Sequence, residues 1–424
     1  MVASLLPTFF VILFFGLPIF ASLALAVVAV LYFSGGVDPL VVPMRMFSGM
    51  NNFSLMSIPF FILAAELMRI GGLSDRLIGL ARALIGWLPG GLAAASVVAC
   101  LMFGSISGSS PATVIAIGTI MYPAMVAAGY NKYFAIGLIT TSGTLGPIVP
   151  PSIALIIYGS VTATSVGQLF AAGLLPALLI GGMLILYASW YSSIKKYPRD
   201  PFPTFASISA AFKRSAWGLG LPVVLLGGIY SGVFTPTESA AAACLYGYFI
   251  GAFVYRTISP KETLIVLRNT GLLAGPLLLI TAGASSFSWL LANSGAPSQL
   301  AAYILSGTDN PVLIVLLFNL ILLVAGCFLD SASAIIILAP LMQPIAASVG
   351  VDPIHFGIIM LVNLSVGMLT PPVGLNLFVA MGIAKMSLFE VFRAAIPTIL
   401  LMVVALMLVS YIPAISTTLP KLIF

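Results

Sequence analysis

Long stretches without any charged residue confine most of this chain to a lipid bilayer. Asp, Glu, Lys and Arg are absent from residues 1–37, 83–131, 133–194 and 269–308. A helix crosses the hydrocarbon core of a membrane with about 20 apolar residues, so the run 133–194 alone holds at least two crossings. Only 6% of all residues are charged, whereas a typical soluble domain has about 25%. We therefore expect an integral membrane protein.

The apolar runs do not alternate between polar and apolar residues, as the strands of a membrane β-barrel would. We expect an all-α polytopic protein of the bacterial inner (cytoplasmic) membrane, with about ten to twelve spanning segments of this length. The N-terminal apolar segment lacks a basic region and a cleavage site, which indicates a retained helix. The three cysteines lie in apolar segments and form neither a disulfide framework nor a metal motif.

Glycines and prolines of the first half recur in the second half in the same order. At one constant spacing, Pro123 recurs as Pro344, Gly129 as Gly350, Gly146 as Gly367, and Pro150-Pro151 as Pro371-Pro372. Because glycine and proline each impose particular backbone dihedrals, their recurrence in register indicates one backbone shape used twice.

Basic residues predict that the two copies have opposite orientations in the membrane. The loop 69–82 carries three arginines, whereas its counterpart near 294–308 carries none. Cytoplasmic loops are enriched in Lys and Arg, which places 69–82 inside the cell and 294–308 outside. We expect two inverted repeats, as in many secondary transporters. The predicted divisions are a first repeat over 1–195, a cytoplasmic connector over 196–216 and a second repeat over 217–424.

Each repeat is expected to contain a re-entrant helical hairpin and a transmembrane helix broken at a Pro-Pro pair. Irregular backbone at membrane depth survives only where it is buried in protein or lines a cavity, and adjacent prolines remove two hydrogen-bond donors from a helix. The predicted hairpins cover about 88–127 and 312–347, and the predicted broken helices cover about 134–158 and 355–380. The segments 36–52 and 256–268 are expected to be interfacial helices.

The hairpin tips and the helix breaks are the candidate binding site. At the tips the candidates are Ser105, Ser107, Gly108, Ser109, Ser110, Asp330, Ser331 and Ser333. In the broken helices they are Ser142, Gly143, Thr144, Gly146, Pro147, Pro150, Asn363, Gly367, Thr370 and Pro371. Freed carbonyls and hydroxyls suit a small cation, and half-helix N-termini suit an anion. The alternative is that the small residues only serve helix packing in lipid.

Four charged or titratable positions need separate interpretations. A buried acid is costly in a membrane, so Asp330 is interpreted as a sodium or proton ligand. Glu238 is interpreted as part of a helix N-terminus, with a ligand role as the alternative. Glu66 and Arg69 have the spacing of a structural ion pair on a helix. For His355, which follows Asp352-Pro353, we expect a solvated or capping role and not a proton relay.

These motifs together resemble the large membrane subunit of TRAP (tripartite ATP-independent periplasmic) transporters. The resemblance covers essentially the whole chain and is carried by Ser107–Thr113, Gly143–Ser152, Phe234–Glu238 and Gly367–Gly374. It implies a sodium-coupled importer of an organic acid anion, such as a C4-dicarboxylate, a keto acid or sialic acid. It also implies a small four-helix membrane subunit, a periplasmic substrate-binding protein and an elevator motion of the hairpin-bearing part.

Two other functions compete with this reading. A divalent-anion/sodium symporter or a passive facilitator would work without a binding protein. A membrane enzyme would need a convergent set of acid, base or nucleophile side chains, and the single histidine and the apolar cysteines argue against one. We therefore expect a transport protein without a cofactor, with sodium as its coupling ion and no nucleic-acid partner.

The predicted topology can be tested by labelling single cysteines from each side of the membrane. A cysteine placed near position 75 should react only with reagent on the cytoplasmic side, and one near position 297 only with reagent outside. Labelling of both positions from the same side would rule out the inverted repeat.

Overall fold

The computed structural model describes residues 2–34, 37–308 and 310–424, and every regular element within these ranges is a helix. Six helices are long and apolar enough to cross a membrane alone, and two bent pairs raise the number to eight. The all-α membrane fold is thereby confirmed. The count is below the expected range of about ten to twelve because several apolar helices are short, among them Gly91–Ser107 and Pro353–Gly367.

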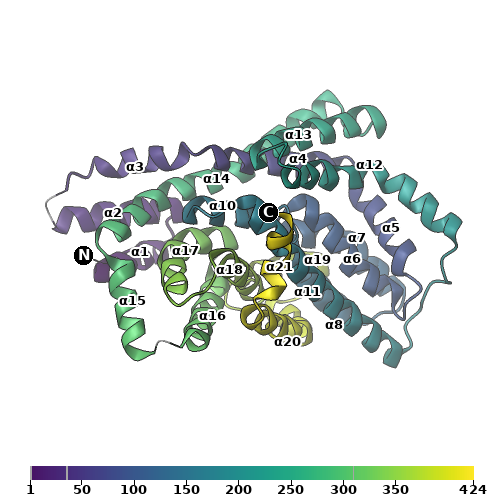
Figure 1. The fold of residues 1–424 in the computed structure, drawn as a ribbon. Helices are drawn as coiled ribbons and strands as arrows, with labels where there is room; N and C mark the ends of the chain where they lie inside the picture. The colour runs from purple at the N-terminus through teal and green to yellow at the C-terminus, as the bar shows by residue number, and fades with distance from the viewer. Residues whose placement is uncertain (1, 35–36, 309) are drawn as a thin grey trace.

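One part of the molecule is an outer layer built from the beginning and the middle of the chain. From the beginning come α1 (Val2–Phe14), α2 (Ile19–Ser34), α3 (Val41–Met50), the 3-10 helix η1 (Phe53–Met56), α4 (Ser57–Ile70) and α5 (Leu73–Ile85). From the middle come α12 (Phe205–Tyr230), α13 (Pro236–Phe249), the π-helix η2 (Ile250–Val254), α14 (Pro260–Asn293) and α15 (Ala296–Gly307). Helix α14 packs along α2, α3 and α4, and α13 packs on α4 (Figure 1).

One expectation for this layer needs correction. The segment 256–268 does not form a separate interfacial helix, because residues 260–268 are the first turns of the continuous helix α14. Its start is fixed by a capping box, in which Ser259 and Glu262 satisfy each other's backbone N–H groups. Helix α12 begins at Phe205, within the expected connector 196–216.

The other part of the molecule contains the hairpin-bearing portion of each predicted repeat. The first comprises α6 (Gly91–Ser107), α7 (Ser110–Ala127), α8 (Lys132–Ser142), α9 (Leu145–Ile148), α10 (Ile153–Thr162) and α11 (Val166–Lys195). The second comprises α16 (Pro311–Phe328), α17 (Ser331–Ser348), α18 (Pro353–Gly367), α19 (Leu375–Ala384), α20 (Leu388–Tyr411) and α21 (Ala414–Ile423). Both have a helical hairpin followed by a helix that is interrupted at the Pro-Pro pair.

The same capping chemistry starts the broken helix in both repeats. The side chain of Asn131 accepts hydrogen bonds from the first N–H groups of α8, and the side chain of Asp352 does the same for α18. Free N–H groups at a helix start are commonly satisfied in this way. The recurrence of Asn131 as Asp352 therefore has a structural reason, since both positions need a short acceptor side chain.

The two repeats interlock. Helix α10, which follows the break in the first repeat, packs against α17 of the second hairpin, and α19, which follows the second break, packs against α7 of the first hairpin. Each broken helix thus contacts its own hairpin with its first part and the other hairpin with its last part. This arrangement brings the tips of both hairpins to the centre of the molecule.

Glycines permit the closest helix contacts within each repeat. A β-carbon at Gly104 would lie 2.9 Å from the Cα atom of Gly146, and one at Gly367 would lie 2.5 Å from the Cα atom of Gly326. Any side chain at these positions would therefore meet backbone, which cannot move aside as a flexible side chain can. Small residues at such crossings are typical of helix packing in membranes.

The substitution Gly367→Ala should destabilise the protein. The added methyl group would push α18 away from α16, and overpacking of this kind costs about 1–3 kcal/mol. The matched control is Gly182→Ala in α11, where an added β-carbon meets nothing within 4 Å. We expect the melting temperature of the purified protein to fall by several degrees for the first variant only, and equal melting temperatures would contradict the tight crossing.

Candidate functional site

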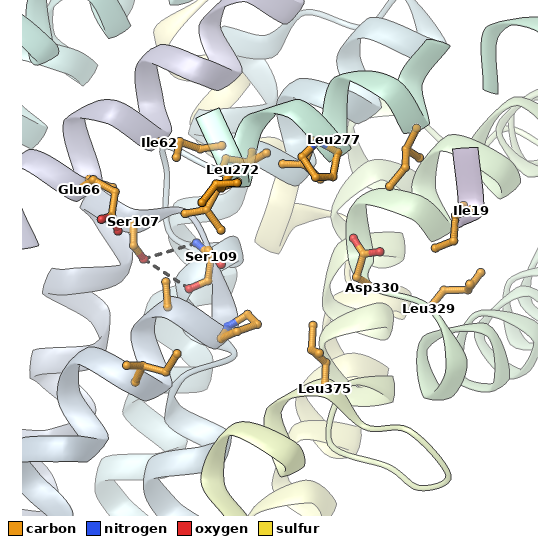
Figure 2. Close-up of a pocket in the computed structure, with 18 of the residues that line it drawn as sticks. Ile19, Ile62, Glu66, Ser107, Ser109, Leu272, Leu277, Leu329, Asp330 and Leu375 are labelled. Carbon is orange, nitrogen blue, oxygen red and sulfur yellow. Dashed lines mark hydrogen bonds between the residues drawn. The ribbon is translucent and has the colours of Figure 1, made fainter. Parts of the chain in front are cut away.

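A cavity of about 760 Å³ lies between the outer layer and the two hairpin tips. Its outer wall comes from α2, α4 and α14, and its inner wall comes from both tips and the starts of α7, α10 and α19. Figure 2 shows Ser107 and Ser109 of the first tip on one side, Asp330 of the second tip on the other, and Leu277 of α14 between them along the upper wall. Most of the lining is apolar, so the few polar groups are concentrated at the tips.

A smaller space of about 130 Å³ adjoins this cavity between the two tips. It is lined by Gly108, Ser109 and Ser110 from the first tip and by Asp330 and Ser331 from the second. Pro147 of the first broken helix also reaches it. The two hairpin tips, which are far apart in the sequence, therefore face each other across one shared space.

The first tip is an uncharged network of hydroxyl groups. The Oγ of Ser107 lies 2.9 Å from the Oγ1 of Thr113, which donates a hydrogen bond of 2.8 Å to the carbonyl of Ser109. Helix α7 begins at this point with Ser109 as its N-cap, and that side chain makes no capping hydrogen bond. The positive end of the α7 dipole therefore remains uncompensated at the cavity, which favours a negative group there.

The second tip carries a negative charge. The carboxylate of Asp330 is the N-cap of α17, where it accepts hydrogen bonds from the N–H groups of Ala332 and Ser333 at 3.0 and 3.3 Å. The hydroxyl group of Ser333 also donates to this carboxylate. Asp330 thus occupies the positive end of α17. The lone pairs of its carboxylate that accept no hydrogen bond are left to the cavity, which favours a cation there. The two tips are chemically opposite.

Each hairpin tip is held against the helix break of its own repeat. A β-carbon at Gly108, where φ is +57°, would lie 2.9 Å from the carbonyl oxygen of Pro151. In the second repeat, the carbonyl of Cys327 accepts hydrogen bonds from Val373 and Gly374 at 3.2 and 3.3 Å. Tip and break are therefore assembled together in both repeats.

The other predicted site residues line neither of these two spaces. They are Ser105, Ser142, Gly143, Thr144, Gly146, Pro150, Ser333, Asn363, Gly367, Thr370 and Pro371. Several bond within their own helices; the hydroxyl of Ser142 donates to the carbonyl of Leu138, and that of Thr144 to the carbonyl of Thr141. They form the layer behind the tips.

Two buried asparagines present oxygens that have no hydrogen-bond partner in the described part of the chain. One is Oδ1 of Asn363 in α18, and the other is Oδ1 of Asn376 at the start of α19. Asn376 was not predicted as a site residue, yet its amide nitrogen donates to the Oγ of Ser110 at 2.6 Å and so joins α19 to the first tip. The sequence feature that could have identified Asn376 as a site residue is its position directly after Pro-Pro-Val-Gly-Leu.

The structure decides three of the separate interpretations. Thr235 and Glu238 form a capping box, which confirms the helix N-terminus. His355 is not solvated but buried, and its ring nitrogens contact the hydroxyl of Ser416 and the carbonyl of Ser410.

The third interpretation, a structural ion pair between Glu66 and Arg69, is confirmed. Both side chains also line the large cavity, which the sequence analysis did not anticipate. Two charged residues near the end of an otherwise apolar helix were the signal for this position.

This protein is a membrane transport protein: its helical fold has six to eight candidate membrane spans, and its sequence matches a transporter family and transporter permeases. The chain belongs to the family described as "Tripartite ATP-independent periplasmic transporter, DctM component", whose model matches residues 6–415. The resemblance found in the sequence is thereby confirmed.

Relatives agree with this family, and a solved structure shares the fold. The chain is 43% identical to the C4-dicarboxylate TRAP transporter large permease protein DctM of Vibrio cholerae, over 96% of this chain and 95% of that one. It is 35% identical to the sialic acid TRAP transporter large permease protein SiaM of the same species, over 97% and 96%. The crystal structure of the Alcanivorax borkumensis YdaH transporter is similar in fold, with a TM-score of 0.61, 16% identity and 86% of each chain covered.

Proposed function

We propose that this chain is the sodium-coupled import subunit for a small organic acid anion in the bacterial inner membrane. The observation that carries the proposal is the pair of opposite hairpin tips on one cavity, an uncapped helix start at Ser109 and a carboxylate at Asp330. One tip suits an anion and the other suits a cation. A cavity that holds both at once provides the physical basis for coupling their movements.

The sodium part of the proposal rests on the carboxylate of the second tip. Sodium is a hard cation, and carboxylate, carbonyl and amide oxygens are the ligands that hard cations prefer. Asp330 lies at the second tip and lines the cavity. Oδ1 of Asn363 and of Asn376 are buried acceptors without a partner in the described chain, but these residues line neither cavity, and Asn376 bonds to Ser110 of the first tip. Asp330 is therefore the ligand on which the sodium proposal depends.

The organic acid part rests on the first tip and on the relatives. The uncapped start of α7 and the hydroxyl group of Ser109, which makes no capping hydrogen bond, offer donors for a carboxylate. The cavity of about 760 Å³ has the size of typical small-molecule sites, which span roughly 300–1,000 Å³. The relatives are named for C4-dicarboxylates and for sialic acid, and all of these substrates carry a carboxylate.

We further propose an elevator motion and two partners. The cavity lies between the outer layer and the interlocked hairpins, so a substrate held at the tips would travel with them if they slid along α4 and α14. The family implies a small four-helix membrane subunit and a periplasmic protein that delivers the substrate. Uptake that persists in proteoliposomes without any soluble protein would count against the second partner.

The substitution Asp330→Asn tests the cation role separately from the cap. Asparagine caps a helix about as well as aspartate, so folding should persist while the charge is lost. We expect sodium-stimulated uptake to need at least about tenfold more sodium, equivalent to about 1.4 kcal/mol. Asp330→Ala removes both features and should also lower the melting temperature, because loss of a cap costs about 1 kcal/mol.

The matched control is Asp352→Asn, because Asp352 is the N-cap of the next helix, α18, and lines neither cavity. The sodium dependence of uptake by the Asp352→Asn variant should equal that of the natural protein. Uptake is measured in proteoliposomes with the partner proteins present. An unchanged sodium response in Asp330→Asn would remove Asp330 from the cation site.

A further inference from the structure

A charged pair faces the cavity from the outer wall. Glu66 and Arg69 lie on the last turns of α4 and line the same cavity as the two tips. Glu66 appears beside Ser107 of the first tip in Figure 2, and α4 contacts α6, the helix that carries Ser107. The pair therefore lines the same cavity as the uncapped start of α7.

The ion pair uses only part of the hydrogen-bonding capacity of the Arg69 guanidinium. Arg69 donates from Nε and Nη2 to the two carboxylate oxygens of Glu66 at 3.0 and 2.7 Å, and Asn269 donates to the same carboxylate at 3.4 Å. Glu66 is thus well satisfied, and its side chain is 13% exposed. The Arg69 side chain is 42% exposed, and its Nη1 group makes no hydrogen bond to the described residues.

The charge balance of the cavity makes this arginine distinctive. Among the described residues that line the cavity, Glu66 and Asp330 are acidic and Arg69 is the only basic one. The positive end of α17 is already occupied by Asp330. An anionic group that lies away from the first tip therefore has one complementary charge in the cavity, the free edge of the Arg69 guanidinium. Such an edge binds carboxylates through parallel hydrogen bonds.

We propose that Arg69 binds the second carboxylate of a dianionic substrate whose first carboxylate lies at the start of α7. This inference rests on the proposed function and extends it, because it makes Arg69 a specificity-determining residue for diacids over monoacids. Glu66 holds the guanidinium in place, and Asn269 in turn donates to the Glu66 carboxylate. A monoacid, by contrast, would use only the first tip.

Succinate and butyrate form a matched pair of probes, because both have four carbons and butyrate lacks one carboxylate. Binding of each is measured for the full chain in nanodiscs of neutral lipid at saturating sodium. In Arg69→Gln, we expect succinate affinity to fall by about tenfold or more and butyrate affinity to change by less than about twofold. In Arg69→Lys, which keeps the charge but loses the planar fork, succinate affinity should fall by about threefold.

A double variant separates loss of the arginine from exposure of the glutamate charge. Glu66→Gln with Arg69→Gln removes both charges, so succinate affinity should stay as low as in Arg69→Gln alone. Recovery to the natural value would show that repulsion by Glu66 caused the loss, and it would overturn the inference. The control Arg82→Gln breaks the ion pair with Asp200, which lies outside this cavity, and should leave both affinities unchanged.

The remaining outcomes separate this inference from the proposed function. Equal losses for succinate and butyrate in Arg69→Gln, or no loss for either, would overturn the role of Arg69 while the proposed function stands. If Arg69→Gln does not fold, the ratio of the two affinities in Arg69→Lys decides, and an unchanged ratio overturns the inference. A natural protein that binds neither acid with sodium present would overturn both.

Discussion

Backbone groups that leave a helix inside a membrane must find partners within the protein, and this requirement organises the centre of the molecule. The hairpin tips and the Pro-Pro breaks are four such places, and each tip meets the break of its own repeat. The carbonyl of Cys327 satisfies two N–H groups after the second break. Glycine crossings at Gly104 and Gly367 bring the backbones close enough for these contacts. The polar groups of the mainly apolar cavity lie together because the irregular backbone of both hairpin tips is gathered at its wall.

The two repeats share a backbone shape but differ at their tips, and the proposed function assigns the two tips separate tasks. Where the first tip has the uncapped Ser109, the second has the capping carboxylate of Asp330. A symmetric pair of tips would offer two similar sites. One polar position therefore distinguishes an anion-favouring helix start from a cation-favouring one, while the surrounding glycines and prolines keep the shape constant.

Local features of this fold could be predicted from the sequence, whereas contacts between distant segments could not. Glycine and proline act on their own backbone, so the hairpins and breaks were visible in the spacing of Gly146, Gly367 and the Pro-Pro pairs. His355 contacts Ser410 and Ser416, which follow it by 55 and 61 residues. The positions of Asn376 and Arg69 at the site likewise depend on helices that meet only in three dimensions.

The interlock of the repeats has a consequence for biosynthesis. Helix α10 completes the first broken segment, but the surface it packs against belongs to α17, which follows much later in the chain. The ribosome therefore releases the first repeat into the membrane before its packing partner has been made. Chains fold largely in the order in which they are synthesised. Helix α10 and the polar break before it therefore lack their contacts with α17 until the second hairpin has been inserted into the membrane. Shielding that intermediate from lipid is a task for the insertion machinery.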